Sequence, residues 1–233
     1  MSDTPIDVFI DLPSFPGPVQ AGRLWSHFRK GRESASFEYN KEWLANPHRF
    51  ALEPLLPLAD GTFHTNPGQS VFGAIGDSTP DRWGRILMRR AELARARTAN
   101  ESPHTLSELD YLLRVNDEAR QGALRFSQDG GQSFCAPPGS TPIPPLVNLS
   151  RLLHAADHFC RDDENAEDLR LLLAPGSSLG GARPKASVKD KKGNLCIAKF
   201  PRYDDEYNVV AWEAVALLSL IHISEPTRHL RIS

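Results

Sequence analysis

Short runs of alternating apolar and polar residues fill the first 40 positions of the chain. The alternation recurs over residues 7–11, 19–28 and 34–39, and proline and glycine separate the runs. A period of two places every second side chain on one face of a strand. Turn-forming residues between such runs favour antiparallel connections. The pattern therefore predicts that the chain begins with antiparallel β-strands.

Helical spacing replaces this alternation further along the chain. Thr79, Pro80 and Asp81 supply in order a helix N-cap, a first-turn proline and an early acid, so we expect a helix to begin there. The same reasoning predicts further helices over residues 107–115, 149–160 and 168–173, a strand over 122–126, and then a glycine-rich turn, two short strands and a last helix. Strands followed by helices in this mixture indicate an α+β fold.

A proline-rich segment interrupts the pattern at residues 136–145, which have the sequence APPGSTPIPP. Proline fixes its own backbone dihedral and has no amide hydrogen, so this segment continues neither a helix nor a sheet. We therefore predict an N-terminal subdomain over residues 1–145 and the start of a second domain over residues 146–218.

Composition and charge exclude several classes of protein. The chain is 24% charged, 40% hydrophobic and 8% aromatic, which is ordinary for a globular protein. Its net charge of −2 gives no global attraction to nucleic acid or to an anionic membrane. The three cysteines have no C-x-x-C spacing, and neither a signal peptide nor an apolar run of membrane-spanning length is found. We expect a cytoplasmic protein that contacts neither nucleic acid nor membrane.

Two clusters of polar side chains are candidate sites. The predicted helix after residue 81 carries six arginines against Asp81 and Glu92; they are Arg82, Arg85, Arg89, Arg90, Arg95 and Arg97. A solvated helix face is the interpretation we favour, and a surface for phosphate, an acidic partner or nucleic acid is the alternative. His154 and His158 have the i, i+4 spacing that can hold a metal ion, but no further ligand cluster accompanies them, so no metal site is predicted.

The segment most informative about function is residues 176–185, with the sequence GSSLGGARPK. Glycines let backbone amides approach phosphate oxygens closely, and serine hydroxyls add donors. The segment is not a Walker A loop, because Ala182 stands where that motif requires lysine. An ordinary glycine-rich hairpin turn is the alternative interpretation.

A lysine at the end of a short strand strengthens the interpretation as a phosphate site. Lys199 shares one strand face with Leu195 and Ile197, so its ammonium group needs a carboxylate or a ligand phosphate nearby. Glu213, on the predicted last helix beside its apolar positions, is the candidate partner. A glycine-rich loop, a strand lysine and a helix glutamate in this order are typical of the nucleotide-binding half of a protein kinase. The alternative is a lysine at a sheet edge that extends its ammonium group into solvent.

Several motifs, taken together and in order, resemble the HipA family of serine/threonine kinase toxins from type II toxin–antitoxin systems. The resemblance extends from about residue 5 to about residue 218, and its motifs are FEY at 37–39 with WL at 43–44, FGAIGDSTPDRWG at 72–84, DEARQGALRF at 117–126, GSSLGGARPK at 176–185, and AKFP at 198–201 leading to WE at 212–213. It implies an N-terminal HipA-type α+β subdomain followed by the beginning of a kinase-like N-lobe. The implied activity is ATP-dependent phosphorylation of serine or threonine on a protein substrate.

The resemblance also implies roles for individual residues. The phosphate-covering loop corresponds to Ser177, Ser178, Leu179, Gly180, Gly181 and Ala182. Lys199 corresponds to the lysine that binds ATP, and Glu213 corresponds to its helix partner. Ser178 corresponds to a serine whose phosphorylation inactivates the kinase by adding negative charge where ATP phosphates bind, and Ser177 is the adjacent alternative. ATP and Mg²⁺ are the implied cofactors, and a helix-turn-helix antitoxin is the implied partner.

The last part of the chain departs from the family pattern near Ser219, after which the sequence is LIHISEPTRHLRIS. The catalytic aspartate, its neighbouring asparagine and the magnesium-binding aspartate have no counterparts here, so no catalytic residue and no metal ligand is assigned. We expect residues 219–233 to be a foreign tail and this N-terminal fragment to be inactive. The alternative is a module without catalysis that only binds an antitoxin or another protein.

Overall fold

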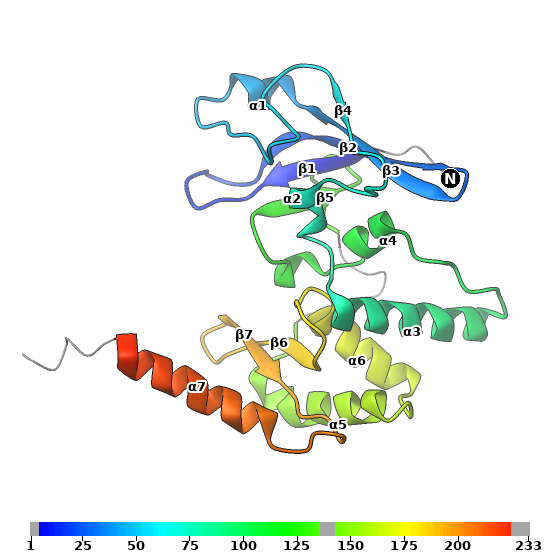
Figure 1. Cartoon of the computed structure of the whole chain (residues 1–233), viewed down its shortest axis with the longest axis vertical. Helices are drawn as coiled ribbons and strands as arrows, with labels where there is room; N and C mark the ends of the chain where they lie inside the picture. Colours follow the sequence, from blue (N-terminus) through cyan, green and yellow to red (C-terminus); the bar gives the residue numbers. More distant parts are fainter. Residues whose placement is uncertain (1–4, 136–142, 225–233) are drawn as a thin grey trace, which may run out of the picture.

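The computed structural model describes residues 5–135 and 143–224 of the chain (Figure 1). An antiparallel sheet lies at one end of the molecule, and a group of helices with a two-stranded hairpin lies at the other. No helix within these described ranges is long and apolar enough to cross a membrane.

The large sheet has five antiparallel strands in the order β4-β3-β2-β1-β5. Lys30 and Gly31 connect β2 to β3 in a two-residue turn in which both residues have positive φ, the conformation that matches the right-handed twist of a hairpin. The strands predicted before residue 40 and over residues 122–126 are confirmed as β1 (Ile6–Ile10), β2 (Val19–Arg29), β3 (Arg32–Tyr39) and β5 (Leu124–Ser127). The short edge strand β4 (Thr62–His64) was not predicted.

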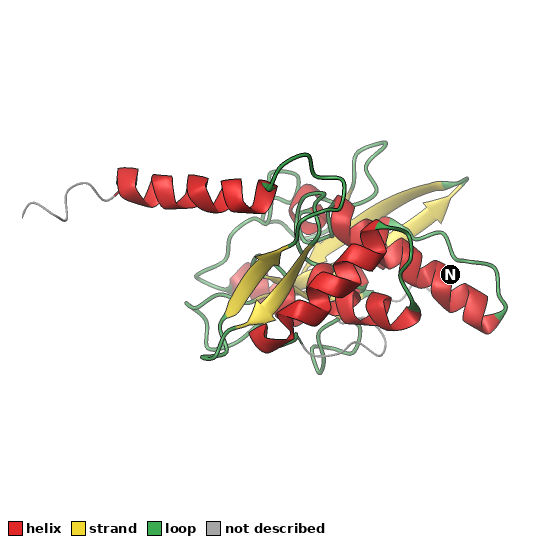
Figure 2. Ribbon diagram, turned by 90° about the horizontal axis from the view of Figure 1, so that it is seen from below, coloured by secondary structure: helices red, strands yellow, loops and turns green. Residues whose placement is uncertain are grey.

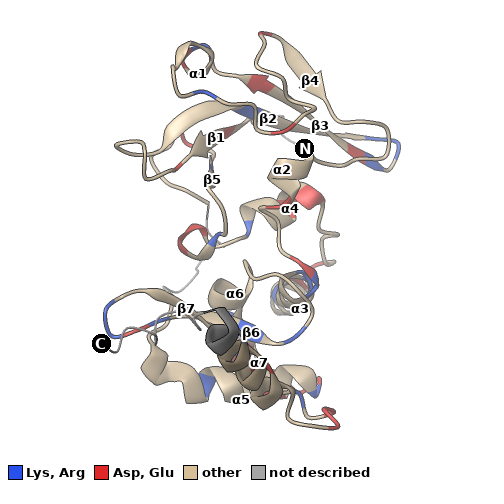
Figure 3. Ribbon diagram, turned by 60° about the vertical axis from the view of Figure 1, so that its left-hand side comes forward, with Lys and Arg blue, Asp and Glu red and all other residues tan. Residues whose placement is uncertain are grey.

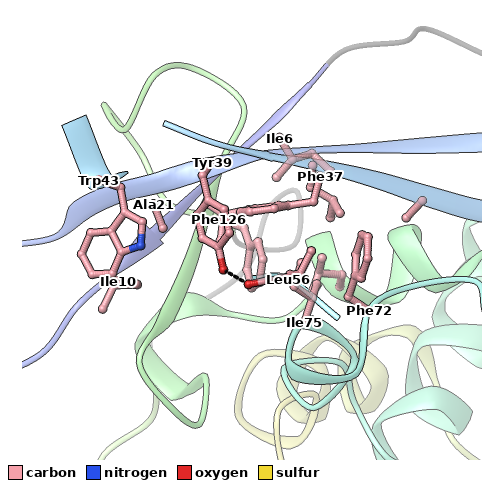
Figure 4. Packing of buried hydrophobic residues seen from close by; sticks show 14 residues of the cluster. Ile6, Ile10, Ala21, Phe37, Tyr39, Trp43, Leu56, Phe72, Ile75 and Phe126 are labelled. Atoms are coloured by element: carbon pink, nitrogen blue, oxygen red, sulfur yellow. Dashed lines mark hydrogen bonds between the residues drawn. The ribbon is translucent and has the colours of Figure 1, made fainter. Parts of the chain in front are cut away.

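One face of this sheet carries the first hydrophobic core. Aliphatic and aromatic side chains form it together, and the Phe37 and Tyr39 rings meet edge to face with centroids 5.0 Å apart (Figure 4). The Tyr39 hydroxyl donates to the Leu56 carbonyl at 2.7 Å, so the one polar atom of this ring is satisfied inside the core. Two short helices, α1 (Lys41–Ala45) and α2 (Gly73–Gly76), contribute Trp43 and Ile75 to the same cluster.

The N-cap of the long helix α3 (Arg82–Ala99) lies two residues after Thr79, the N-cap that the sequence predicts. Its N-cap is Asp81, whose side chain makes no capping bond in the described part of the chain. The other helices match the predicted segments closely. They are α4 (Glu108–Leu113), α5 (Leu149–Cys160) and α6 (Ala166–Gly176). The 3-10 turns η1 (Asp117–Ala119) and η2 (Leu146–Asn148) were not predicted.

A second hydrophobic core joins α3 to elements that begin about 50 residues or more after it ends. Trp83 and Leu87 of α3 pack with Leu152 of α5, Leu172 of α6 and Val188 of the small hairpin. The helix α3 therefore packs with the second half of the chain, although the predicted boundary follows it at residue 145. Residues 136–142 of the predicted linker lie outside the described residues.

The chain ends in a hairpin of β6 (Lys185–Lys189) and β7 (Leu195–Lys199) and the helix α7 (Val209–Ser224). The apolar positions of the last helix that the sequence predicts to face the core are Val209, Trp212, Ala216 and Leu220. The prediction is wrong for Trp212 and Ala216: α7 extends away from the other elements (Figures 1 and 2), Trp212 is 63% exposed, and Ala216 is exposed as well. Apolar residues surround this helix on all sides, so the sequence defines no single buried face. The helix continues without a break past Ser219, and residues 225–233 of the predicted tail lie outside the described residues.

Three of the six arginines of α3, a helix whose charged positions are coloured in Figure 3, form ion pairs with carboxylates of the described residues. Arg85 pairs with Glu108 at 2.6 Å, and Arg90 pairs with Glu164 at 2.8 Å and also with Asp162. These pairs join α3 to α4 and to the segment before α6. They support the interpretation of a helix whose charges serve the fold, because a nucleic-acid surface needs cations that are available to phosphate.

Candidate phosphate-binding site

The glycine-rich loop follows α6 directly and leads into β6. Gly176, the last residue of α6, packs so closely that a Cβ there would lie 2.7 Å from Leu87 Cδ1. Gly181 has φ of +82°, a conformation that residues with side chains adopt only under strain. Glycine is therefore required at both ends of the loop, once for close packing and once for backbone geometry.

The loop divides into a buried half and an exposed half. Ser177, Ser178 and Leu179 are buried, whereas Gly180 and Gly181 are exposed, as is Ala182. The Ser177 hydroxyl donates to the Ala174 carbonyl at 3.3 Å. Only the exposed half can present backbone amides to a ligand while the loop keeps this conformation.

Ser178, the predicted regulatory phosphosite, lies in the buried half. Its Oγ atom is shielded from solvent and has no hydrogen-bond partner among the described residues. A buried hydroxyl without a partner is unfavourable by roughly 1–3 kcal/mol. The buried Ser178 hydroxyl also cannot reach the active site of a kinase from this position. Modification of Ser178 therefore requires the loop to leave its place beside α3.

The N-terminus of α3 holds the loop, although about 100 residues separate them in sequence. The Trp83 backbone N–H donates to the Gly181 carbonyl at 3.0 Å, and the Trp83 indole N–H donates to the Lys185 carbonyl at 2.9 Å. The Asp81 carboxylate accepts from the Gly181 N–H at 2.6 Å. Sequence reasoning missed both Asp81 and Trp83 as residues of the site. The available signal was their place in the motif at residues 72–84, which was interpreted as a helix start and as part of the family resemblance.

Two lysines stand opposite each other across the small hairpin. Lys185 of β6 and Lys199 of β7 are directly paired in the antiparallel register, which places both side chains on one face. Lys199 Nζ contacts Glu213 Oε1 of α7, the partner that the sequence indicated, and Lys185 Nζ donates to the Gly180 carbonyl. Burial and the neighbouring charge of Lys199 lower the pKa of Lys185.

The surroundings of Lys199 differ from the expectation of an apolar, buried run. Leu195 and Ile197, which share its strand face, are about half exposed, and the Lys199–Glu213 pair itself is partly exposed. β7 is an edge strand of this two-stranded sheet, and its face that carries Leu195, Ile197 and Lys199 is in contact with solvent. The site is a surface cluster of charges beside a glycine loop, and an exposed pair of this kind adds little to stability.

The two histidines of α5 contact each other, and one of them contacts the start of α6. The rings of His154 and His158 lie 4.0 Å apart, and His158 contacts Asp168, which closes the capping box of α6. The contact with Asp168 raises the pKa of His158. Within residues 5–135 and 143–224, no group of three or more histidine, cysteine, aspartate or glutamate side chains is placed to hold a metal ion.

A cavity of about 530 Å³ lies between α3 and α6, apart from the loop. Apolar side chains such as Met88 and Leu173 form much of its lining. Glu92, also in the lining, is bound by Arg95 and Arg114, so its charge is already satisfied within the chain. Sequence reasoning did not predict this cavity, because it forms between helices that are distant in sequence.

The fold and the site together define an α+β protein in which an antiparallel-sheet domain precedes a glycine-rich loop and a lysine-bearing hairpin. Residues 17–127 match the family model of the HipA N-terminal domain, and this match supports a protein of the HipA family. The matched segment contains most of the large sheet and helices α1 to α4, including the motif that holds the loop. No curated protein matches the chain. The glycine-rich loop, Lys199 and Glu213 lie beyond the matched residues.

Proposed function

We propose that this chain is the nucleotide-binding part of a HipA-type serine/threonine protein kinase. In this proposal the exposed loop amides and Lys199 bind the phosphates of ATP, and Glu213 orients the Lys199 ammonium group. Phosphorylation of Ser178 would act as an inactivating switch at the same loop.

One observation carries the proposal: Lys199 contacts Glu213 beside a glycine-rich loop, in the order that kinases use. The local chemistry fits a polyphosphate, because two ammonium groups share one face of the hairpin next to Gly180 and Gly181. Lysine ammonium groups and glycine amides are the donors that phosphate-binding loops present.

Magnesium is part of the proposal through ATP, whose phosphate charges the ion neutralises when bound. The described residues hold no carboxylate set suited to the ion, so we assign none of them as a ligand. The residues of this chain bind and orient the phosphates. A protein substrate and a helix-turn-helix antitoxin complete the proposal on the basis of the family resemblance, and a cytoplasmic location on the basis of the sequence.

A binding module without catalysis is the second candidate. The exposed apolar side chains of β7 and α7 favour it, among them Ile197, Trp212 and Val215. Large exposed apolar side chains gathered on neighbouring elements are typical of interaction surfaces. The two candidates differ in one respect that is easily measured, because only the first requires nucleotide to bind at the loop.

Titration of a fluorescent ATP analogue, followed by anisotropy, tests the proposal. Lys199→Met should weaken binding by about tenfold or more, since a charge-assisted contact is worth roughly 1.5–3 kcal/mol. Lys192→Met is the matched control, because Lys192 is exposed at the tip of the same hairpin, and it should leave the affinity within twofold. Equal affinity of the two variants would refute the assigned role of Lys199.

A further inference from the structure

The contact between Asp81 and the glycine-rich loop has a feature that a helix cap does not explain. Asp81 occupies the N-cap position of α3, yet its side chain makes no capping bond within the described residues. Its Oδ2 atom instead accepts the N–H of Gly181 at 2.6 Å. That amide belongs to the exposed half of the loop, the half in which a phosphate would find its donors.

The charges around the loop cancel within the protein. Lys199 contacts Glu213, Lys185 donates to the Gly180 carbonyl, and the Gly181 amide is bound by Asp81. Each of these three donors therefore already has an acceptor from the chain itself, and two of the three acceptors are carboxylates. A single N–H donates one strong hydrogen bond, so a carboxylate oxygen and a phosphate oxygen cannot both hold Gly181.

We propose that Asp81 is an internal competitor for the anion site of the loop, so that a polyphosphate binds fully only when the Asp81 carboxylate withdraws from Gly181. This inference rests on the proposed function, because it takes the loop to be a phosphate site. It makes the N-terminus of α3, within the HipA N-terminal domain, the element that closes the site.

The local structure allows Asp81 to withdraw without loss of the loop. Asp81 is exposed, and two other bonds hold the loop to α3, both donated by Trp83. These bonds involve the Gly181 and Lys185 carbonyls, so they leave the Gly181 amide free to change its acceptor. Removal of the Asp81 carboxylate should therefore open the site rather than dismantle it.

Titration with inorganic tripolyphosphate, followed by the NMR amide signal of Gly181, tests the inference in the full chain. Asp81→Ala should shift this signal before any ligand is added and should tighten binding by about tenfold, the effect of removing one charged competitor. Asp81→Asn, which keeps an acceptor but loses the charge, should give an intermediate affinity. Asp77→Ala is the matched control, because it removes an exposed acid of equal charge from the same segment, and it should change the affinity by less than twofold.

The outcomes separate the inference from the function on which it rests. If Lys199→Met weakens tripolyphosphate binding while Asp81→Ala leaves it unchanged or weaker, the site stands and the competitor role of Asp81 is overturned. A Gly181 signal that Asp81→Ala does not move would overturn it equally. If tripolyphosphate does not bind, or binds the same in wild type and Lys199→Met, the proposed phosphate site fails and the inference fails with it.

Discussion

Glu92 is a buried carboxylate whose removal should destabilise the protein in a way that depends on pH. It lies on α3, is only 3% exposed, and accepts hydrogen bonds from Arg95 and Arg114 and from the backbone N–H of His104. The hydrogen bond from Arg95 is the largest of the causes that lower the pKa of Glu92 from 4.5 to about 2. The perturbation is Glu92→Gln, which keeps the size and removes the charge.

The magnitude follows from the shift in pKa. At about 1.4 kcal/mol per unit, the shift corresponds to an upper limit of ~3 kcal/mol. The side chains of Arg95 and Arg114 are 50% and 30% exposed, so solvent screens part of the interaction and we expect ~2 kcal/mol at pH 7. Because the pKa of Glu92 is lower in the folded state than in the unfolded state, this contribution is complete above about pH 4.5. It is lost as the pH falls towards 2.

Urea denaturation at pH 7 and at pH 3 measures this effect as a difference in the free energy of unfolding between wild type and Glu92→Gln. The difference should be ~2 kcal/mol at pH 7 and clearly smaller at pH 3. Glu101→Gln is the control, because Glu101 also pairs with Arg95 but is 58% exposed, and it should cost less than about 0.5 kcal/mol. A variant as stable as wild type at pH 7, or a difference that does not shrink in acid, would refute this reasoning.

Three further predictions concern the loop. Gly84→Ala should destabilise the protein by about 1–2 kcal/mol in thermal or urea denaturation, because the new Cβ would lie 2.5 Å from the Ser177 carbonyl oxygen, whereas Gly76→Ala, with its nearest neighbour at 3.4 Å, should change stability little; equal effects would contradict the packing described. In a protein with a complete kinase domain, mass spectrometry should find phosphate on Ser178. Hydrogen exchange over residues 176–185 should be faster in the modified form. Phosphate solely on Ser177 would rule out the assignment. In a protein with a complete kinase domain, Lys199→Met should abolish phosphate incorporation from ATP and Glu213→Gln should reduce it less, while wild-type incorporation by the lysine variant would exclude its role.

Local patterns predicted the elements of this fold well. The strands before residue 40 and the helix over residues 149–160 were predicted because alternation, spacing and turn residues act within a few positions. The Lys199–Glu213 contact was also predicted, since a strand lysine near an apolar helix restricts the choice of partners.

Contacts between distant segments could not be predicted in the same way. The hydrogen bonds that Asp81 and Trp83 make with the loop connect residues about 100 positions apart, and the periodicity of the sequence gives no information about such contacts. The exposure of Trp212 was missed for a different reason, because a helix that is apolar all round gives no information about which side is covered. Both the contacts of the loop with α3 and the exposure of Trp212 depend on tertiary packing.

The central claim is that the glycine-rich loop and Lys199 bind the phosphates of ATP, and amide chemical-shift mapping with Mg·ATP tests it most directly. We predict that the largest shifts will fall on Gly180, Gly181 and Lys199, and that Lys199→Met will reduce them at equal ligand concentration. Shifts confined to the cavity between α3 and α6, or no shift at the loop at saturating nucleotide, would contradict the claim.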